Sequence, residues 1–172
     1  MSSMRLDLIE GAGSFAGADF SPCRTWRYKL WRTWDARKGF TMFLMLNPST
    51  ADEAKNDPTV ERCQRYAIRW GYGGLIVCNL FAYRATAPAA MKAAGDPVGP
   101  GNDAAILECA ARSAIIVCAW GNHGSHLGRS GHVKAMLSEA GHALHCLTVT
   151  GRGEPGHPLY LRKDLMPILM DT

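Results

Sequence analysis

The stretch FTMFLMLNPST, residues 40–50, is an apolar run that breaks into a polar turn containing proline. The run GGLIVCNLF, residues 73–81, also meets an asparagine, and GHPLYL, residues 156–161, forms a second Pro-containing turn. Apolar runs that are continuous rather than alternating are typical of strands buried on both faces of a parallel sheet. Because ligands bind at the carboxyl ends of such strands, we expect these three places to line one pocket.

Strand and helix signals alternate outward from this stretch. Apolar runs predict core strands over residues 40–46, 75–80, 114–120 and 143–149. Helices are expected from Asp57-Pro58 onward, within 85–101, from Asp103 onward, over 132–140 and, as a terminal helix, over 164–170. This alternation predicts an α/β fold, a three-layer α/β/α sandwich with a short parallel sheet.

Residues 1–39 precede this pattern and are interpreted as an N-terminal extension of a single domain that spans residues 1–172. A chain of 172 residues suits one domain with its own core. Within the extension, residues 25–34 (TWRYKLWRTW) are rich in β-forming residues and predict an edge strand or a hairpin. The basic residues among its aromatics fit either a surface that contacts phosphates or a solvated basic face of a strand pair.

Composition narrows the partners and the compartment. The net charge of +4 permits a polyanionic partner without demanding one. No apolar run reaches the roughly 18 residues of a membrane span, and the N-terminus lacks the apolar core of a signal peptide. We therefore expect a cytoplasmic protein that does not bind membranes. The six cysteines show no metal-ligand spacing, so we expect no bound metal. We also expect the protein to be a monomer that uses no cofactor.

Four motifs resemble those of the uracil-DNA glycosylase superfamily and follow one another in its order. MLNPST (45–50) resembles the first motif, Gly-x-Asp-Pro-Tyr or Gly-x-Asn-Pro-Gly, and GHPLYL resembles the second, His-Pro-Ser-Pro-Leu. LIVCNLFAYRATAP (75–88) resembles the middle strand with its base-reading asparagine, and IVCAWG (116–121) resembles the later strand. The likeness covers roughly residues 40–162. The combination also resembles a family of uncharacterised bacterial and phage proteins, a domain of unknown function within that superfamily.

The resemblance implies a uracil-DNA glycosylase-like fold and gives roles to single residues. Asn47 matches the position that orients a water, and His157 matches the donor to the carbonyl of the departing base. Asn79 matches the residue that pairs with a base edge, a task that suits an amide with both donor and acceptor atoms. Asp52 is the reserve candidate for a general base. Taken singly, each asparagine and the histidine also fits an ordinary turn or cap.

The rest of the first motif departs from the superfamily pattern. Leu46 stands where the motif has glycine, and Pro48 is retained. Ser49 replaces the tyrosine that, in the uracil-specific branch, presses against position 5 of the base. All three residues are predicted to bind the base. The small side chain of Ser49 favours a pyrimidine that carries a group at position 5.

Residues around the same turns are predicted to contact DNA. They are Arg84, Arg152, Tyr160, Leu161 and Arg162. The arginines flank the expected cleft and suit phosphate contacts. Leu161 matches the superfamily's wedge leucine, which inserts into a base stack, but ordinary core packing fits this residue equally well.

The function that these residues favour is hydrolysis of the N-glycosidic bond of a flipped pyrimidine in single- or double-stranded DNA. Two alternatives use the same pocket: a non-catalytic sensor of a base or nucleotide, and an enzyme that acts on free nucleosides or nucleotides. A salt-dependent affinity for DNA separates DNA binding from free-nucleotide binding. Formation of abasic sites separates catalysis from sensing.

Overall fold

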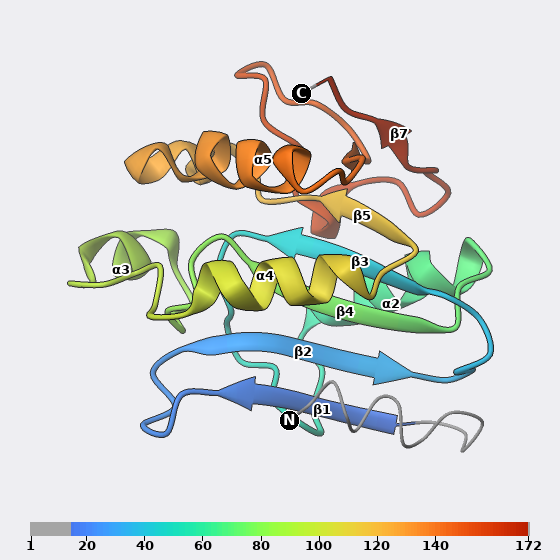
Figure 1. Cartoon of the computed structure of the whole chain (residues 1–172), viewed down its shortest axis with the longest axis horizontal. Coiled ribbons are helices and arrows are strands. Elements are labelled where there is room, and N and C mark those ends of the chain that lie inside the picture. The colour runs from blue at the N-terminus through green and yellow to red at the C-terminus, as the bar shows by residue number, and fades with distance from the viewer. Residues whose placement is uncertain (1–14, 172) are drawn as a thin grey trace.

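The computed structural model describes residues 15–171. These residues form an α/β fold around one mixed sheet of seven strands in the order β1-β2-β4-β3-β5-β6-β7 (Figure 1). The strands are β1 (Phe15–Phe20), β2 (Arg27–Thr33), β3 (Phe40–Met45), β4 (Gly74–Asn79), β5 (Ile115–Cys118), β6 (His145–Cys146) and β7 (Ile168–Leu169). The helices are α2 (Pro58–Arg69), α3 (Pro88–Ala93), α4 (Asn102–Ala111) and α5 (Arg129–Glu139), with 3₁₀ turns η1 (Asn122–Gly128) and η2 (Pro158–Tyr160).

The expectation of a short parallel sheet is confirmed at the centre of the sheet and is wrong at both edges. The central strands β4, β3, β5 and β6 are parallel, whereas β2 pairs antiparallel with β4, β1 with β2, and β7 with β6. Residues 25–34 contain β2, which forms a hairpin with β1. The edge strand is β1 and not β2 (Figure 1). The described part of the N-terminal extension therefore adds two strands to the sheet that carries the core.

Helices cover both faces of the sheet. Phe43 of β3 packs with Val60 and Tyr66 of α2 in one apolar cluster. Its neighbour Leu44 points to the other face, where it packs in a second cluster with residues of α3, α4 and α5. Figure 1 shows α4 and α5 in front of the sheet and α2 behind it. Successive side chains of a strand alternate between faces, so the continuous apolar run of β3 is what two covered faces require.

The signal for α2 is confirmed in detail. Asp57 is its N-cap, with a carboxylate oxygen that accepts the N–H of Val60 at 2.9 Å, and Pro58 is the first helical residue. The predicted cap at Asp103 is wrong. Gly101, in the left-handed conformation at φ 81°, precedes α4 instead. The Asp103 carboxylate is used in an ion pair with Arg129 at 2.6 Å.

The terminal helix expected over residues 164–170 is absent from the described chain. This segment contains β7, in which Leu169 pairs with His145 and Ile168 with Cys146. Pro167 lacks the N–H that a helix interior needs, and the open edge of β6 offers unpaired backbone groups instead. No helix among residues 15–171 is long and apolar enough to cross a membrane.

The connections of the parallel strands create a crevice. The chain passes from β3 to β4 through α2 on one face and from β4 to β5 through α3 and α4 on the other. In doubly wound sheets, the point where the winding reverses leaves a crevice at the carboxyl ends of the strands, and ligands bind there. Here that point lies beside the carboxyl end of β3, which leads into Leu46, Asn47 and Pro48.

Candidate functional site

A cavity of about 320 Å³ opens at the carboxyl ends of β3 and β4. This volume is at the lower end of the range, about 300–1,000 Å³, that is usual for small-molecule sites. The predicted residues in its lining come from three segments that are far apart in sequence. The predicted residues that line it are Leu46, Asn47, Pro48, Ser49, Asn79, His157 and Tyr160.

Asn47 offers a hydrogen-bond acceptor to the cavity. Its Nδ2 donates to the carbonyl oxygens of Ala85, at 2.8 Å, and Pro48, at 3.1 Å. These two acceptors fix which end of the amide is nitrogen. Oδ1 receives no hydrogen bond from another described residue, so it is available to accept one from water or a ligand.

Asn79 offers a donor. The residue is only 2% exposed, and its Oδ1 accepts a hydrogen bond from Nη2 of Arg27 at 3.3 Å. Its backbone carbonyl is held separately by Nδ2 of Asn102 at 3.0 Å. The Asn79 Nδ2 makes no hydrogen bond to another described residue, so its two N–H groups are available to a ligand in the cavity.

His157 presents a second donor. Its Nδ1 accepts the backbone N–H of Leu159 at 3.2 Å and thereby caps η2. A ring nitrogen that accepts carries no proton, so in neutral His157 the proton lies on Nε2. Burial lowers the pKa of His157 below its ordinary value of 6.5, and Asp57 opposes this effect only in part. The neutral ring with Nε2–H is therefore the form present at pH 7.

The carboxylate of the cavity is Asp57 and not the predicted Asp52. Oδ1 of Asp52 accepts the N–H groups of Ala54 and Lys55, at 2.9 and 2.8 Å, and the residue does not line the cavity. These bonds lower the pKa of Asp52. Asp57 lines the cavity while it caps α2, and its Oδ2 also accepts the N–H of Ala51 at 3.3 Å.

Arg27, at the start of β2, is a wall residue that sequence reasoning missed. It is 2% exposed, lines the cavity, and donates from Nη1 to the carbonyl of Ala51 at 3.2 Å. Burial lowers its pKa to about 10, which still leaves it charged at pH 7. It reaches the cavity through the antiparallel pairing of β2 with β4, for which the sequence carries no local signal.

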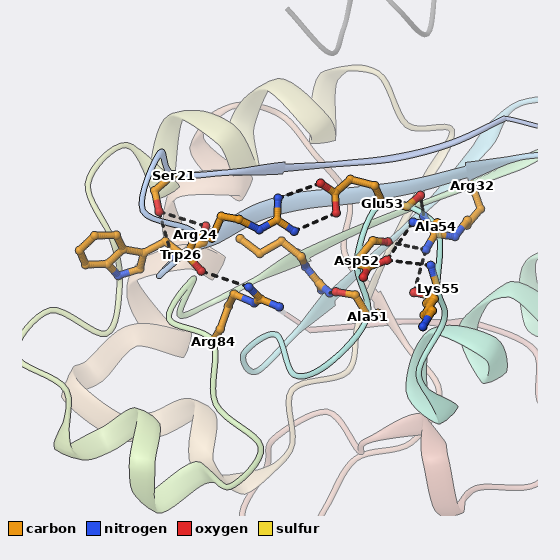
Figure 2. A network of polar contacts seen from close by, with 11 residues as sticks. Ser21, Arg24, Trp26, Arg32, Ala51, Asp52, Glu53, Ala54, Lys55 and Arg84 are labelled. Atoms are coloured by element: carbon orange, nitrogen blue, oxygen red, sulfur yellow. Dashed lines mark hydrogen bonds and ion pairs between the residues drawn. The ribbon is translucent and has the colours of Figure 1, made fainter.

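The loop that follows the first motif is held by arginines of the hairpin (Figure 2). Arg24 pairs with both carboxylate oxygens of Glu53, at 2.8 and 2.9 Å. Arg32, 6% exposed, donates to the carbonyls of Asp52 at 2.7 Å and Lys55 at 3.2 Å. The hairpin predicted as an extension therefore fixes the loop that connects the motif to Asp57.

The residues predicted to contact DNA differ in exposure and in the partners that they already have. Tyr160 is 89% exposed at the mouth of the cavity, and Arg152 is exposed in the turn before it. Arg84 is half-buried, stacks on the Phe20 ring and donates to the Arg24 carbonyl at 3.2 Å. Arg162 forms an exposed ion pair with Asp164 at 2.8 Å.

Leu161 does not have the exposure that a wedge requires. Its side chain is partly buried and packs against the cluster beneath α2. The alternative of ordinary core packing is therefore the one that the structure supports. Tyr160, its exposed neighbour, occupies the position from which a side chain can reach a ligand outside the cavity.

Gly156 fits the turn because a side chain would not. A Cβ placed on Gly156 would collide with the hydroxyl of Thr148, so a larger residue here would force the Thr148 side chain to move. His123 also lines the cavity, next to Trp120. Among residues 15–171 no group of three or more His, Cys, Asp or Glu side chains is placed to hold a metal ion.

Comparison with known proteins places this chain in a family. The family described as "Protein of unknown function (DUF1643)" matches residues 27–159, which is most of the chain. The chain belongs to this family. The match begins at Arg27 and ends at Leu159, so the DUF1643 region includes β2 and every wall residue of the cavity except Tyr160. No curated protein and no solved structure matches the chain.

Proposed function

We propose that this protein is a DNA glycosylase-like hydrolase with a uracil-DNA glycosylase-like three-layer fold. It acts as a cytoplasmic monomer, without a cofactor, on a pyrimidine extruded from DNA, and it prefers a base that carries a group at position 5. The observation that carries this proposal is the convergence of Asn47, Asn79 and His157 on one cavity, each with a polar atom that bonds to no residue among 15–171.

The polarity of these atoms suits cleavage of an N-glycosidic bond. As the bond from the sugar C1′ to the base nitrogen breaks, its electron pair moves onto the base, and Nε2–H of His157 stabilises the growing charge on a base carbonyl. Oδ1 of Asn47 accepts a hydrogen bond from the water that attacks C1′. Asp57 is the carboxylate that takes the proton of this water, while the base leaves as its anion. Transfer of that proton to the base through solvent restores Asp57 and gives a free base and an abasic sugar.

The size of the wall at Ser49 supports a substituted base. Ser49 lines the cavity and is half-buried, next to Pro48. A serine leaves open the space that a larger side chain would fill, so a 5-substituent meets no steric barrier there. An apolar wall discriminates only weakly against a smaller occupant, by about 1–3 kcal/mol per missing methylene, so plain uracil enters but binds less well.

A basic groove beside the cavity supports DNA as the partner. A second hollow, of about 150 Å³, is lined by Arg62, Arg65, Tyr66, Arg69 and Lys163. Arg62 donates to the carbonyl of Leu161 at 2.8 Å, and Leu161 directly follows Tyr160 of the cavity, so both hollows adjoin the same turn. Phosphates along this groove with a base in the cavity would place Tyr160 against the neighbouring base, where aromatic stacking is favourable.

The experiment that tests this function is an incubation with oligonucleotides that contain one uracil, one mismatched base or one 5-substituted pyrimidine. Alkali cleaves the strand at an abasic site, so a gel reports excision. Cleavage at a 5-substituted pyrimidine is the expected result. Binding without cleavage would favour the sensor, and cleavage of free nucleosides without affinity for DNA would favour the free-nucleoside enzyme.

A further inference from the structure

Burial of the charged Arg27 side chain costs desolvation free energy, so we asked what its position in the cavity wall provides. The guanidinium is almost fully enclosed, and its Nε is buried without a partner among the described residues. The Asp57 carboxylate, also in the cavity wall, attracts this charge but forms no hydrogen bond to it, since the two oxygens of Asp57 accept the backbone N–H groups of Val60 and Ala51. A buried charge with incomplete pairing destabilises a fold relative to an apolar residue of the same size. Its two side-chain bonds go to the carbonyl of Ala51 and to Oδ1 of Asn79.

The bond to Asn79 determines which way that amide faces. A guanidinium has donors and no acceptor, so the atom of Asn79 beside Arg27 is the oxygen. In the opposite orientation, Nδ2 of Asn79 would face the guanidinium, donor against donor, inside a buried wall. A buried donor that faces another donor loses its hydrogen bond, so the second orientation is disfavoured.

An amide in one orientation distinguishes two classes of pyrimidine. A 4-keto pyrimidine offers an acceptor at position 4 and an N–H donor at position 3. A 4-amino pyrimidine offers a donor at position 4 and an acceptor at position 3. For a ring held in one place, Nδ2 and the remaining lone pair of Oδ1 match the first edge, and only the reversed amide matches the second.

We propose that Arg27 is the specificity-determining positioning residue of the cavity: by holding Oδ1 of Asn79, it selects a keto-bearing base edge over an amino-bearing one. This inference rests on the part of the proposed function in which the ligand is a base, and it does not depend on hydrolysis. It gives the buried charge a role that an apolar residue could not fill. It also explains why the β1–β2 hairpin, outside the superfamily-like motifs, forms one wall of the cavity.

The test compares two nucleosides that differ at position 4 and share the methyl group at position 5. Thymidine and 5-methyl-2′-deoxycytidine are titrated into ¹⁵N-labelled protein, and dissociation constants are taken from NMR chemical-shift changes. The proteins are the wild type, Arg27→Met, which keeps the volume but has no donor, and Arg27→Lys, which keeps one donor. Arg24→Met is the matched control, because Arg24 lies in the same hairpin and contacts Glu53 outside the cavity.

The wild type and Arg24→Met should bind thymidine roughly tenfold or more tightly than 5-methyl-2′-deoxycytidine, as expected for a mismatched buried polar pair. Arg27→Lys should keep this preference, and Arg27→Met should reduce it to less than about threefold, because the amide can then reverse. A purely structural role would weaken both nucleosides equally and leave their ratio unchanged, and that result would overturn the proposal.

The wild-type ratio tests the proposal even if Arg27→Met does not fold. Equal affinity for the two nucleosides, or a preference for the amino form, would contradict it directly. The keto preference without excision from DNA would refute the proposed hydrolysis and leave the role of Arg27 intact. Excision without the keto preference would support the proposed hydrolysis and refute the role of Arg27. The absence of binding to either nucleoside at millimolar concentration would overturn the proposed function and the role of Arg27 together.

Discussion

The two ring nitrogens of His157 have different surroundings. Nδ1 caps η2 through the N–H of Leu159, whereas Nε2–H faces the cavity. We predict that His157→Asn, which keeps a capping side chain, lowers the rate of excision on the order of 100-fold and leaves the thermal midpoint nearly unchanged. Single-turnover excision and thermal unfolding measure the two effects. His157→Ala removes both the donor and the cap, so it should also lower stability, typically by about 1 kcal/mol.

The same ring predicts how the protein responds to acid. The folded-state pKa of His157 lies below its ordinary value of 6.5 because burial disfavours the charged ring. Above pH 6.5 the ring is neutral in both the folded and the unfolded chain, and it contributes no pH dependence. As pH falls below 6.5, the unfolded chain takes up a proton that the folded chain resists, so stability decreases until the folded-state pKa is reached.

Urea unfolding at pH 7.5 and at pH 5.5 checks this sign. The free energy of unfolding of the wild type should fall, relative to that of His157→Asn, between the two values. A wild type that gains stability over the variant at the lower pH would show that His157 is charged in the fold. Excision should likewise survive at pH 6.5 and disappear only as the pH falls through the lowered pKa.

Ser49 is a small residue in the wall of the cavity. Ser49→Tyr adds a phenol ring to a side chain that lines the cavity, so it should shift excision from 5-substituted pyrimidines toward plain uracil or abolish it. Relative rates on uracil and 5-methyluracil oligonucleotides measure the change. Thr50→Tyr is the matched control, because Thr50 is exposed and does not line the cavity. An unaltered preference in Ser49→Tyr would remove the argument for a modified base.

At the scale of elements, the loop from Pro48 to Asp57 depends on β2. Arg32 is buried and donates to several backbone carbonyls of this loop. We predict that Arg32→Met lowers the free energy of unfolding by about 3 kcal/mol or more, because buried acceptors lose charged donors. Glu53→Gln, which breaks only the exposed pair with Arg24, should leave the urea midpoint nearly unchanged. Equal losses in the two variants would contradict this account of the loop.

Elements with local signals were predictable from the sequence, and elements that depend on pairing were not. The cap Asp57 and the first residue Pro58 define the start of α2 within the sequence itself. The strand β7 forms because the edge of β6 is open, so residues 164–170 alone favoured a different answer. Asp103 has the chemistry of a cap, but Arg129 and His132, from a helix later in the chain, engage its carboxylate.

The residues of the candidate site also fall into those that local sequence predicts and those that depend on pairing between distant segments. Asn47, Asn79 and His157 were predictable because each adjoins a strand end or a turn with a visible motif. Arg27 was not predictable, because its bond to Asn79 joins residues 52 positions apart across an antiparallel pair of strands. Asp52 and Asp57 were both acidic residues near the motif, and only the path of the loop shows which one reaches the cavity.

At the scale of the whole molecule, we propose that the cavity and the basic groove bind DNA together. Arg69 and Lys163 line the groove, and neither makes a side-chain hydrogen bond to another described residue. We predict that Arg69→Gln or Lys163→Gln weakens DNA binding across all sequences and lowers the slope of log affinity against log salt by about one. Arg37→Gln is the control, because Arg37 pairs with Asp35 and does not line the groove. An affinity for DNA that is independent of salt would favour the free-nucleotide alternative.

The central claim is that one cavity binds an extruded pyrimidine and releases it by hydrolysis. The most direct measurement incubates the wild type and His157→Asn with an oligonucleotide that carries a single 5-substituted 4-keto pyrimidine. Mass spectrometry then quantifies the free base and the abasic strand. The account predicts equal amounts of both products with the wild type and on the order of 100-fold slower release with His157→Asn. An intact oligonucleotide after prolonged incubation with each 5-substituted pyrimidine and with uracil would contradict it.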